Sequence, residues 1–202
     1  MSLLLTLLLA ASPASPEAAF WSWFTRNADR VATIRDATEP VADELADQLA
    51  SINPDLTFEL GTSRRPYELI ISAGGIKAAF PAVQRLVAAA PPISGWKIVA
   101  FRPRSAAGLI IEIGGYRVDP AEVWFEAERD GKKYGVTLYI PGFRNDTNGK
   151  QAGYLLLDSS LGEYDVETKL GFIDFKPVPA DPVRAGLRPL SELPALADHP
   201  AP

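Results

Sequence analysis

At 202 residues, with 47% hydrophobic and 22% charged residues, the chain has the composition of a globular protein with one sizeable core or two small ones. Its formal net charge of −5 argues against a general nucleic-acid-binding protein, which would carry an excess of basic residues. Cysteine is absent, which excludes disulfides, thiolate metal sites and a cysteine nucleophile. The one histidine, His199, lies in a Pro-rich tail and supports neither a Ser-His-Asp triad nor a multi-histidine metal site.

The first residues have the pattern of a signal peptide. The apolar run 3–11 is followed by the small residues of Ser12-Pro13-Ala14, and the run is too short to span a bilayer. No Lys or Arg precedes it. We therefore expect residues 1–18 to be a leader, no transmembrane span, and export of the mature protein to a periplasm. A cytoplasmic protein with an apolar leader is the alternative.

Two amphipathic helices are predicted next. Phe20, Phe24, Val31 and Ile34 recur at helical spacing, and Thr38-Glu39-Pro40 is a helix start signal for a second helix that Asn53-Pro54 ends. The first helix carries four clustered aromatic residues, Phe20, Trp21, Trp23 and Phe24. Core packing is the favoured interpretation of this cluster, and a partner-binding or membrane-interface patch is the alternative.

The next segment has the order strand, strand, helix, strand. Alternating apolar residues predict strands over 56–60 and 67–72, joined by a polar turn. Gly74-Gly75 breaks the pattern, a helix follows over 76–90, and the Pro91-Pro92 pair stops it. A third strand is predicted over 96–101.

A second segment repeats this order after a connecting strand over 109–113. Strands are predicted over 123–128 and 134–140 around the hairpin dipeptide Asp130-Gly131, followed by a loop over 142–149 and a helix over 152–161. In the closing strand, over 169–175, alternation allows only one of Phe172 and Ile173 to be buried. Residues 178–202 form a Pro-rich tail.

The two segments look like copies of one module. Tyr67 follows Phe58 at the same interval as Tyr134 follows Phe125, and the segments end on Phe101-Arg102-Pro103 and Phe175-Lys176-Pro177. We predict an α+β fold in which residues 19–177 form a single domain of two tandem ββαβ modules (55–104 and 121–177) plus the N-terminal helical region. The helices should cover one face of mixed or antiparallel sheet.

Four phrases resemble a family of bacterial proteins that has no established activity. The phrases are residues 53–59 (NPDLTFE), 71–83 (ISAGGIKAAFPAV), 96–104 (WKIVAFRPR) and 161–167 (LGEYDVE), and the resemblance runs from about Phe20 to Pro177. It implies an intact folded unit, and it carries over no ligand and no catalytic residue.

A site for an anion is predicted where the two modules meet. Such junctions concentrate ligand sites, and Arg102, Arg104, Tyr116 and Lys176 follow strand ends or turns there. Arg binds carboxylate or phosphate groups through two parallel hydrogen bonds. Arg64, Arg65, Lys132 and Lys133 at the hairpin tips are alternative members of such a cradle, and charged residues that guard turns are the simpler interpretation.

Carboxylates are the other candidates for chemistry. Glu59 and Glu126 occupy matching positions of the two modules, where alternation places them on the solvent side. An acidic segment at the turn that closes the last helix could bind a divalent ion, although solvated turns are more common. This segment contains Asp158, Glu163, Asp165 and Glu167. The polar run 145–149 lacks the ligand spacing of a calcium loop.

These observations favour a non-catalytic binding or interaction protein with a protein partner or a small anionic ligand. A hydrolase that uses carboxylates, with or without a divalent ion, is the alternative. The sequence carries no nucleotide motif and implies no cofactor and no metal.

Overall fold

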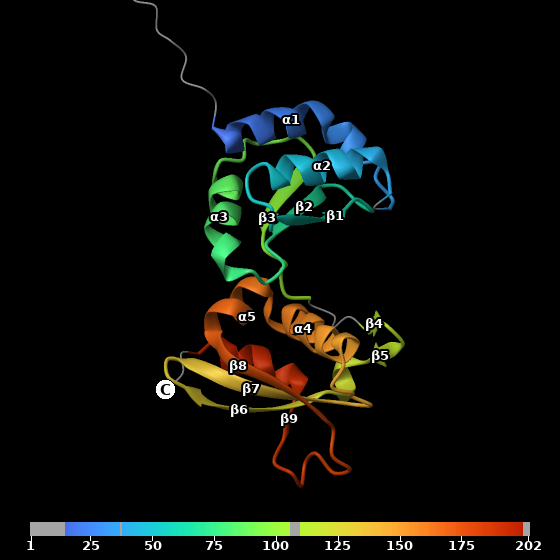
Figure 1. Cartoon of the computed structure of the whole chain (residues 1–202), viewed down its shortest axis with the longest axis vertical. Helices are drawn as coiled ribbons and strands as arrows, with labels where there is room; N and C mark the ends of the chain where they lie inside the picture. The colour runs from blue at the N-terminus through green and yellow to red at the C-terminus, as the bar shows by residue number, and fades with distance from the viewer. Residues whose placement is uncertain (1–14, 37, 106–109, 200–202) are drawn as a thin grey trace, which may run out of the picture.

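The computed structural model describes residues 15–36, 38–105 and 110–199, which fold into two lobes stacked along the long axis (Figure 1). The protein is 40% helical and 26% strand, so it belongs to the α+β class. Most of the expected leader, residues 1–14, lies outside the described residues. The first helix begins at Pro16, where the side chain of Ser15 accepts a hydrogen bond from the backbone N–H of Ala18. No described helix is long and apolar enough to cross a bilayer.

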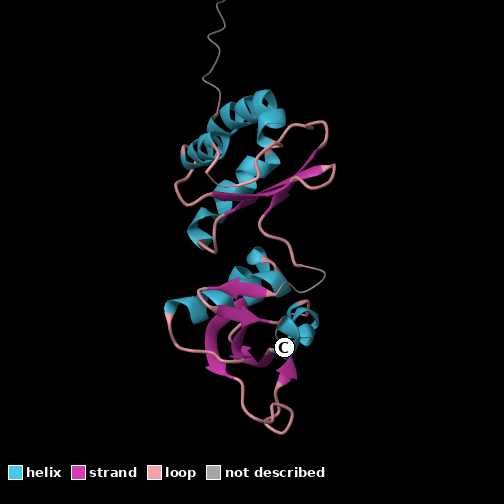
Figure 2. Cartoon of the chain, turned by 90° about the vertical axis from the view of Figure 1, so that its right-hand side faces the viewer, coloured by secondary structure: helices cyan, strands magenta, loops and turns pink. Residues whose placement is uncertain are grey.

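The first lobe is a three-stranded sheet with helices on one side. Its elements are α1 (Pro16–Val31), α2 (Pro40–Ala50), β1 (Thr57–Gly61), β2 (Tyr67–Ser72), a 3-10 turn η1 (Lys77–Ala79), α3 (Phe80–Ala88) and β3 (Trp96–Ala100). The strand order is β1-β2-β3, with β1 antiparallel and β3 parallel to β2. Helices α1 and α2 lie on the side of the sheet that faces away from the second lobe (Figures 1 and 2).

The second lobe is built around a four-stranded sheet. Its elements are β4 (Ile111–Ile113), β5 (Tyr116–Val118), η2 (Pro120–Glu122), β6 (Trp124–Asp130), β7 (Lys133–Ile140), α4 (Thr147–Leu161), α5 (Glu163–Lys169), β8 (Leu170–Pro177), β9 (Arg188–Pro189), η3 (Leu190–Glu192) and α6 (Leu193–Ala197). The order is β8-β7-β6-β9; β6 is antiparallel and β8 parallel to β7. Helices α4 and α5 lie between this sheet and the first lobe (Figure 1).

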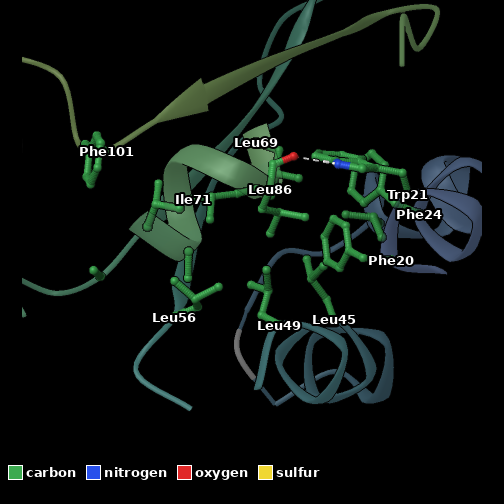
Figure 3. Close-up of a cluster of buried hydrophobic side chains, with 14 of the residues drawn as sticks. Phe20, Trp21, Phe24, Leu45, Leu49, Leu56, Leu69, Ile71, Leu86 and Phe101 are labelled. Atoms are coloured by element: carbon green, nitrogen blue, oxygen red, sulfur yellow. Dashed lines mark hydrogen bonds between the residues drawn. The ribbon is translucent and has the colours of Figure 1, made fainter. Parts of the chain in front are cut away.

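Each lobe has its own hydrophobic core. In the first, Phe20, Trp21 and Phe24 of α1 are buried against α2, α3 and the sheet, and the indole N–H of Trp21 donates to the carbonyl of Leu86 at 2.7 Å (Figure 3). The aromatic residues of the first helix are therefore core residues, as the favoured interpretation predicted; Trp23 is partly buried against the same core.

The second core includes part of the Pro-rich tail. Leu190, Leu193 and Ala197 are buried against residues of β6, β7 and α4. In the closing strand, Ile173 packs on this core while Phe172 is 42% exposed, so Ile173 is the inward residue of the pair.

Two helix boundaries differ from the sequence prediction. Helix α4 begins at Thr147, inside the expected loop, because the side chain of Asp146 accepts the N–H of Gly149 and caps it. The acidic segment expected to be a turn is a separate helix, α5, because Gly162 with φ 81° interrupts the chain between the two helices.

Candidate functional site

The carboxylate of Glu163 is buried where the two lobes meet, and Glu163 is 0% exposed. Its Oε1 accepts the backbone N–H groups of Ala73 at 3.0 Å and Gly75 at 3.1 Å. Its Oε2 accepts the N–H of Arg102 at 3.2 Å, and the Glu163 N–H donates to the Arg102 carbonyl at 3.0 Å. The Glu163 carboxylate of the second lobe is thus held by three backbone N–H donors: two from the first lobe and one from Arg102, in the segment that follows β3.

The chain around Glu163 folds to allow this close approach. A Cβ on Gly162 would lie 3.1 Å from the carbonyl oxygen of Arg102, so a residue without a side chain fits there best. Glu163 and Asp165 stand in the first turn of α5, where the helix dipole favours negative charge. The sequence prediction placed these acids at a helix C-terminus, where charge of this sign is unfavourable, and that placement was wrong.

Arg102 joins carboxylates from both lobes. Its Nε donates to Oε1 of Glu59 on β1, and its Nη1 donates to Oδ2 of Asp158 on α4 at 2.8 Å. Burial raises the pKa of Asp158 to about 6, because the loss of solvation outweighs the attraction of Arg102, and the nearby charge of Glu163 adds to the rise. We call Glu59, Arg102, Asp158 and Glu163 the junction cluster.

Arg104 is held beside the junction cluster by two carboxylates. Its two Nη atoms donate to both oxygens of Asp198, at 3.0 and 2.7 Å, and Nη2 also donates to Asp165 at 2.7 Å. The Nε donates to the carbonyl of Leu161 at 2.9 Å. The sequence analysis predicted that the guanidinium of Arg104 binds an anionic ligand. In the structure, its Nε and both Nη atoms donate to groups of the protein itself.

Tyr116 and Lys176 contact residues other than Arg102 and Arg104. The Tyr116 hydroxyl accepts the N–H of Arg144 at 2.9 Å, and Lys176 Nζ lies 3.7 Å from a carboxylate oxygen of Glu126. In the described part of the chain, no hydrogen bond or ion pair joins Tyr116 or Lys176 to either arginine. The anion-binding role of the four residues stays a prediction.

The basic residues at the first hairpin tip are far from the junction cluster along the sheet. Tyr67, next to the tip, pairs with Trp96 at the start of β3, whereas Arg102 follows the end of β3. Arg64 and Arg65 line a cavity of about 590 Å³ at that tip, with Lys97 and Glu68. A single cradle that combines Arg64 and Arg65 with Arg102 is therefore not formed.

Glu59 and Glu126 have different partners. Glu126 accepts a hydrogen bond from the Tyr139 hydroxyl at 2.7 Å, which raises the pKa of Tyr139 to about 12. It lines a hollow of about 450 Å³ on the outer face of the second sheet, together with Phe172 and Lys176. Among the described residues, no group of three or more His, Asp or Glu side chains is arranged to hold a metal ion.

A groove runs along the outer edge of the first sheet, between α2 and β1. Its volume is about 560 Å³, which lies within the range of ligand pockets. We call it the β1 groove, and its lining residues are Ile34, Arg35, Asp36, Ala42, Ala46, Leu56, Thr57, Phe58, Glu59, Leu60 and Thr62. Sequence reasoning missed it because it is assembled from a loop, a helix and a strand; the small pair Ala42 and Ala46, one helical turn apart, was the available signal.

The polar lining residues of the β1 groove are ordered by bonds to the protein. Arg35 donates from Nη1 to the carbonyls of Ala32 at 3.0 Å and Ile34 at 2.9 Å, and to Thr62 Oγ1 at 3.3 Å. Glu59 belongs to both the groove and the junction cluster, and its side chain is 51% exposed. A ligand in the groove can therefore reach a carboxylate that also holds Arg102.

Comparison of the chain with protein-family models, with curated proteins and with solved structures gives no match.

Proposed function

We propose that this chain is a non-catalytic binding protein whose ligand occupies the β1 groove. The observation that carries the proposal is the groove itself: an apolar-lined space of about 560 Å³ beside a sheet edge with which no described strand pairs. Ligand sites are typically concave and mostly apolar, with a few placed polar groups. Ile34, Leu56 and Leu60 supply the apolar lining here, and Arg35 and Glu59 supply charged groups.

The junction cluster fits a structural role better than a catalytic one. Each of its carboxylates is already bonded, Glu163 to backbone N–H groups and both Glu59 and Asp158 to Arg102. Every described buried side-chain nitrogen or oxygen has a hydrogen-bond partner. A binding protein needs such a fixed frame, because a preformed site loses little entropy when it binds.

The frame itself is proposed to be a tandem repeat of one ββαβ module, over 55–104 and 121–177. In its support, β1, β2 and β3 pair in the same senses as β6, β7 and β8, antiparallel and then parallel, with helices before the third strand in each lobe. Superposition of the two segments tests the proposal. If their helices are placed differently, the equal Phe–Tyr spacing in the two segments is a coincidence and the segments are not copies of one module.

The binding proposal is tested by mapping ligands onto the protein in solution. A library of small apolar and amphipathic fragments is screened against the isotope-labelled protein by NMR. We expect amide shifts at Ile34, Ala46 and Leu60 with the binding fragments. Ala46→Trp, which places a large ring in the groove, should weaken their binding at least tenfold.

Ala50→Trp is the matched control. Ala50 is exposed on the same helix but does not line the groove, so this variant should bind fragments as the unchanged protein does. If fragment shifts map to the outer face of the second sheet, or if both variants bind equally well, the β1 groove is not the ligand site.

A carboxylate-based hydrolase is the second candidate, and Asp158 is the observation that favours it. A carboxyl whose pKa is raised to about 6 can hold and release a proton near neutral pH, as a general acid must. Turnover of a panel of ester, phosphate and glycoside substrates, lost in Asp158→Asn but kept in Ala46→Trp, would replace the binding proposal by the enzymatic one.

A further inference from the structure

Strand β1 is an edge strand with a free side. It pairs with β2 over its whole length, from Thr57 opposite Ser72 to Gly61 opposite Glu68, and no described strand pairs with its other side. An edge strand leaves outward N–H and C=O groups that can pair with another extended chain. The β1 groove lies at this free edge, so a ligand in it meets backbone donors and acceptors as well as apolar side chains.

Alternation along β1 gives the edge two different faces. Phe58 and Leu60 pack against the first core on the α2 side, whereas Thr57 and Glu59 are exposed on the opposite face. A strand added at this edge would alternate in the same way. Its residues would point in turn into the apolar groove and toward the face that carries Glu59.

Charge argues against a second copy of this chain as the occupant. Glu59 is the central residue of β1, so antiparallel pairing of two β1 strands about their centres would set two Glu59 carboxylates opposite each other. Like charges at directly opposite positions destabilise a sheet. Arg102, which pairs with Glu59, also pairs with Asp158 and lies beside Glu163, so three carboxylates share one guanidinium and the charge of Glu59 is only partly offset. The groove also carries Asp36, and Arg35, the cation among its lining residues, donates to two carbonyls. A basic residue opposite Glu59 would remove this repulsion.

We infer that the ligand is an extended segment of another protein that adds to β1 as a fourth strand. This inference rests on the proposed role of the β1 groove. The segment carries apolar residues at alternate positions and Lys or Arg between them. The apolar residues fill the groove beside Ala46 and Leu56, and one basic residue meets Glu59. Strand addition gains affinity from main-chain hydrogen bonds and specificity from alternate side chains.

The inference is tested with short synthetic peptides and the full chain. The probe is a capped Lys-Val-Lys-Val-Lys peptide, which covers β1 with its central Lys opposite Glu59 and its two Val residues on the groove side, opposite Phe58 and Leu60. The first control is Glu-Val-Glu-Val-Glu, and the second is the Lys peptide with every backbone amide N-methylated, which cannot pair as a strand. Affinity is measured by calorimetry, and hydrogen exchange of the β1 amides is followed by NMR.

We expect the Lys peptide to bind at least tenfold more tightly than the Glu peptide and to slow exchange of the outward amides of β1. N-methylation should abolish binding, and Ala46→Trp should weaken it while Ala50→Trp does not. Glu59→Gln, which keeps the side-chain shape, should reduce the preference for Lys over Glu.

Three outcomes would overturn strand addition. Equal binding of the N-methylated peptide would show that the main chain of the ligand is not used. Failure of all peptides, with fragments still binding in the groove, would leave the proposed function standing without this ligand class. Dimerisation of the protein that protects β1 amides and excludes the peptide would make a second copy the occupant.

Discussion

Arg102 and Glu163 hold each other through their backbones as well as through a side chain. The N–H of Arg102 donates to the Glu163 carboxylate at 3.2 Å, while the N–H of Glu163 donates to the Arg102 carbonyl at 3.0 Å. This reciprocal pair joins the exit of β3 to the start of α5. The two lobes are therefore connected by more than the covalent chain, and several outcomes can be expected from breaking the connection.

Glu163→Gln should destabilise the protein strongly. Both carboxylate oxygens of Glu163 accept backbone N–H groups, but the Gln side chain has an NH₂ group in place of one of these oxygens. This NH₂ group cannot accept a hydrogen bond, so one buried backbone N–H would lose its partner. We expect a loss of about 3 kcal/mol in the free energy of unfolding, measured by urea denaturation. Glu128→Gln, at an exposed strand position, is the control and should change stability by less than about 0.5 kcal/mol. A similar small change for Glu163→Gln would show that the buried bonds contribute little.

Arg102→Met should destabilise the protein chiefly through Asp158. Without the guanidinium, the ionised Asp158 carboxylate loses its partner in a buried position, at a cost of about 2–4 kcal/mol at pH 8. Asp158→Asn in the same chain should recover part of that loss, because the charge is removed. A double-mutant cycle measures the coupling between the two residues. Additive effects would mean that the ion pair is not coupled in solution.

Asp158 should make stability depend on pH between about 4 and 6. Its pKa is raised to about 6 in the folded protein and is ordinary in the unfolded chain, so the folded state binds the proton more tightly in this range. The contribution of Asp158 to stability is thus fully present below about pH 4 and is lost as the pH rises through 6.

The measurement compares the unchanged protein with Asp158→Asn at several pH values. The stability of the unchanged protein relative to the variant should fall as the pH rises from 4 to 7. In NMR, the side-chain carboxyl carbon of Asp158 should titrate with a midpoint near 6. A midpoint near 4, with a pH-independent difference between the two proteins, would refute the assignment.

Gly153→Ala should disturb the packing of α4 on the second sheet. A Cβ at this position would lie 2.3 Å from a ring carbon of Phe175, which is too close for any real contact. Overpacking of this kind costs about 1–3 kcal/mol. The loss should appear as a lower thermal midpoint, and Phe175→Leu should relieve part of it in the double variant. If Phe175→Leu makes the Gly153→Ala variant worse, the ring is not the obstacle.

The sequence predicted the local elements because their signals are local. The strand Tyr67–Ser72 alternates apolar residues, and Asp130-Gly131 is a strong hairpin dipeptide, so both features were expected and both are present. The start of α4 was missed because its cap, Asp146, lies within a run of polar residues that also suits a loop. The separate helix α5 was missed because a single glycine between two helical segments was taken for the end of a helix.

The candidate sites depend on residues that are distant in the sequence. Glu163 meets Ala73 and Gly75 only after both lobes have folded, and no spacing rule relates these positions. The sequence did indicate that Arg102 stands near the meeting point of the segments, but it could not show that Glu59 and Asp158 would occupy its donors. Long-range pairing of this kind is set by topology and is not encoded in local propensity.

The ion pair of Arg104 with Asp198 has a consequence for the autonomy of the second lobe. These residues lie just before its first described strand and just after its last helix, and their pairing brings the two ends of the lobe together. A unit whose ends are adjacent can be excised, permuted or inserted into another chain without stretching its fold. The second lobe is thus suited to circular permutation, whereas excising it would leave the buried Glu163 carboxylate without the N–H donors of Ala73 and Gly75.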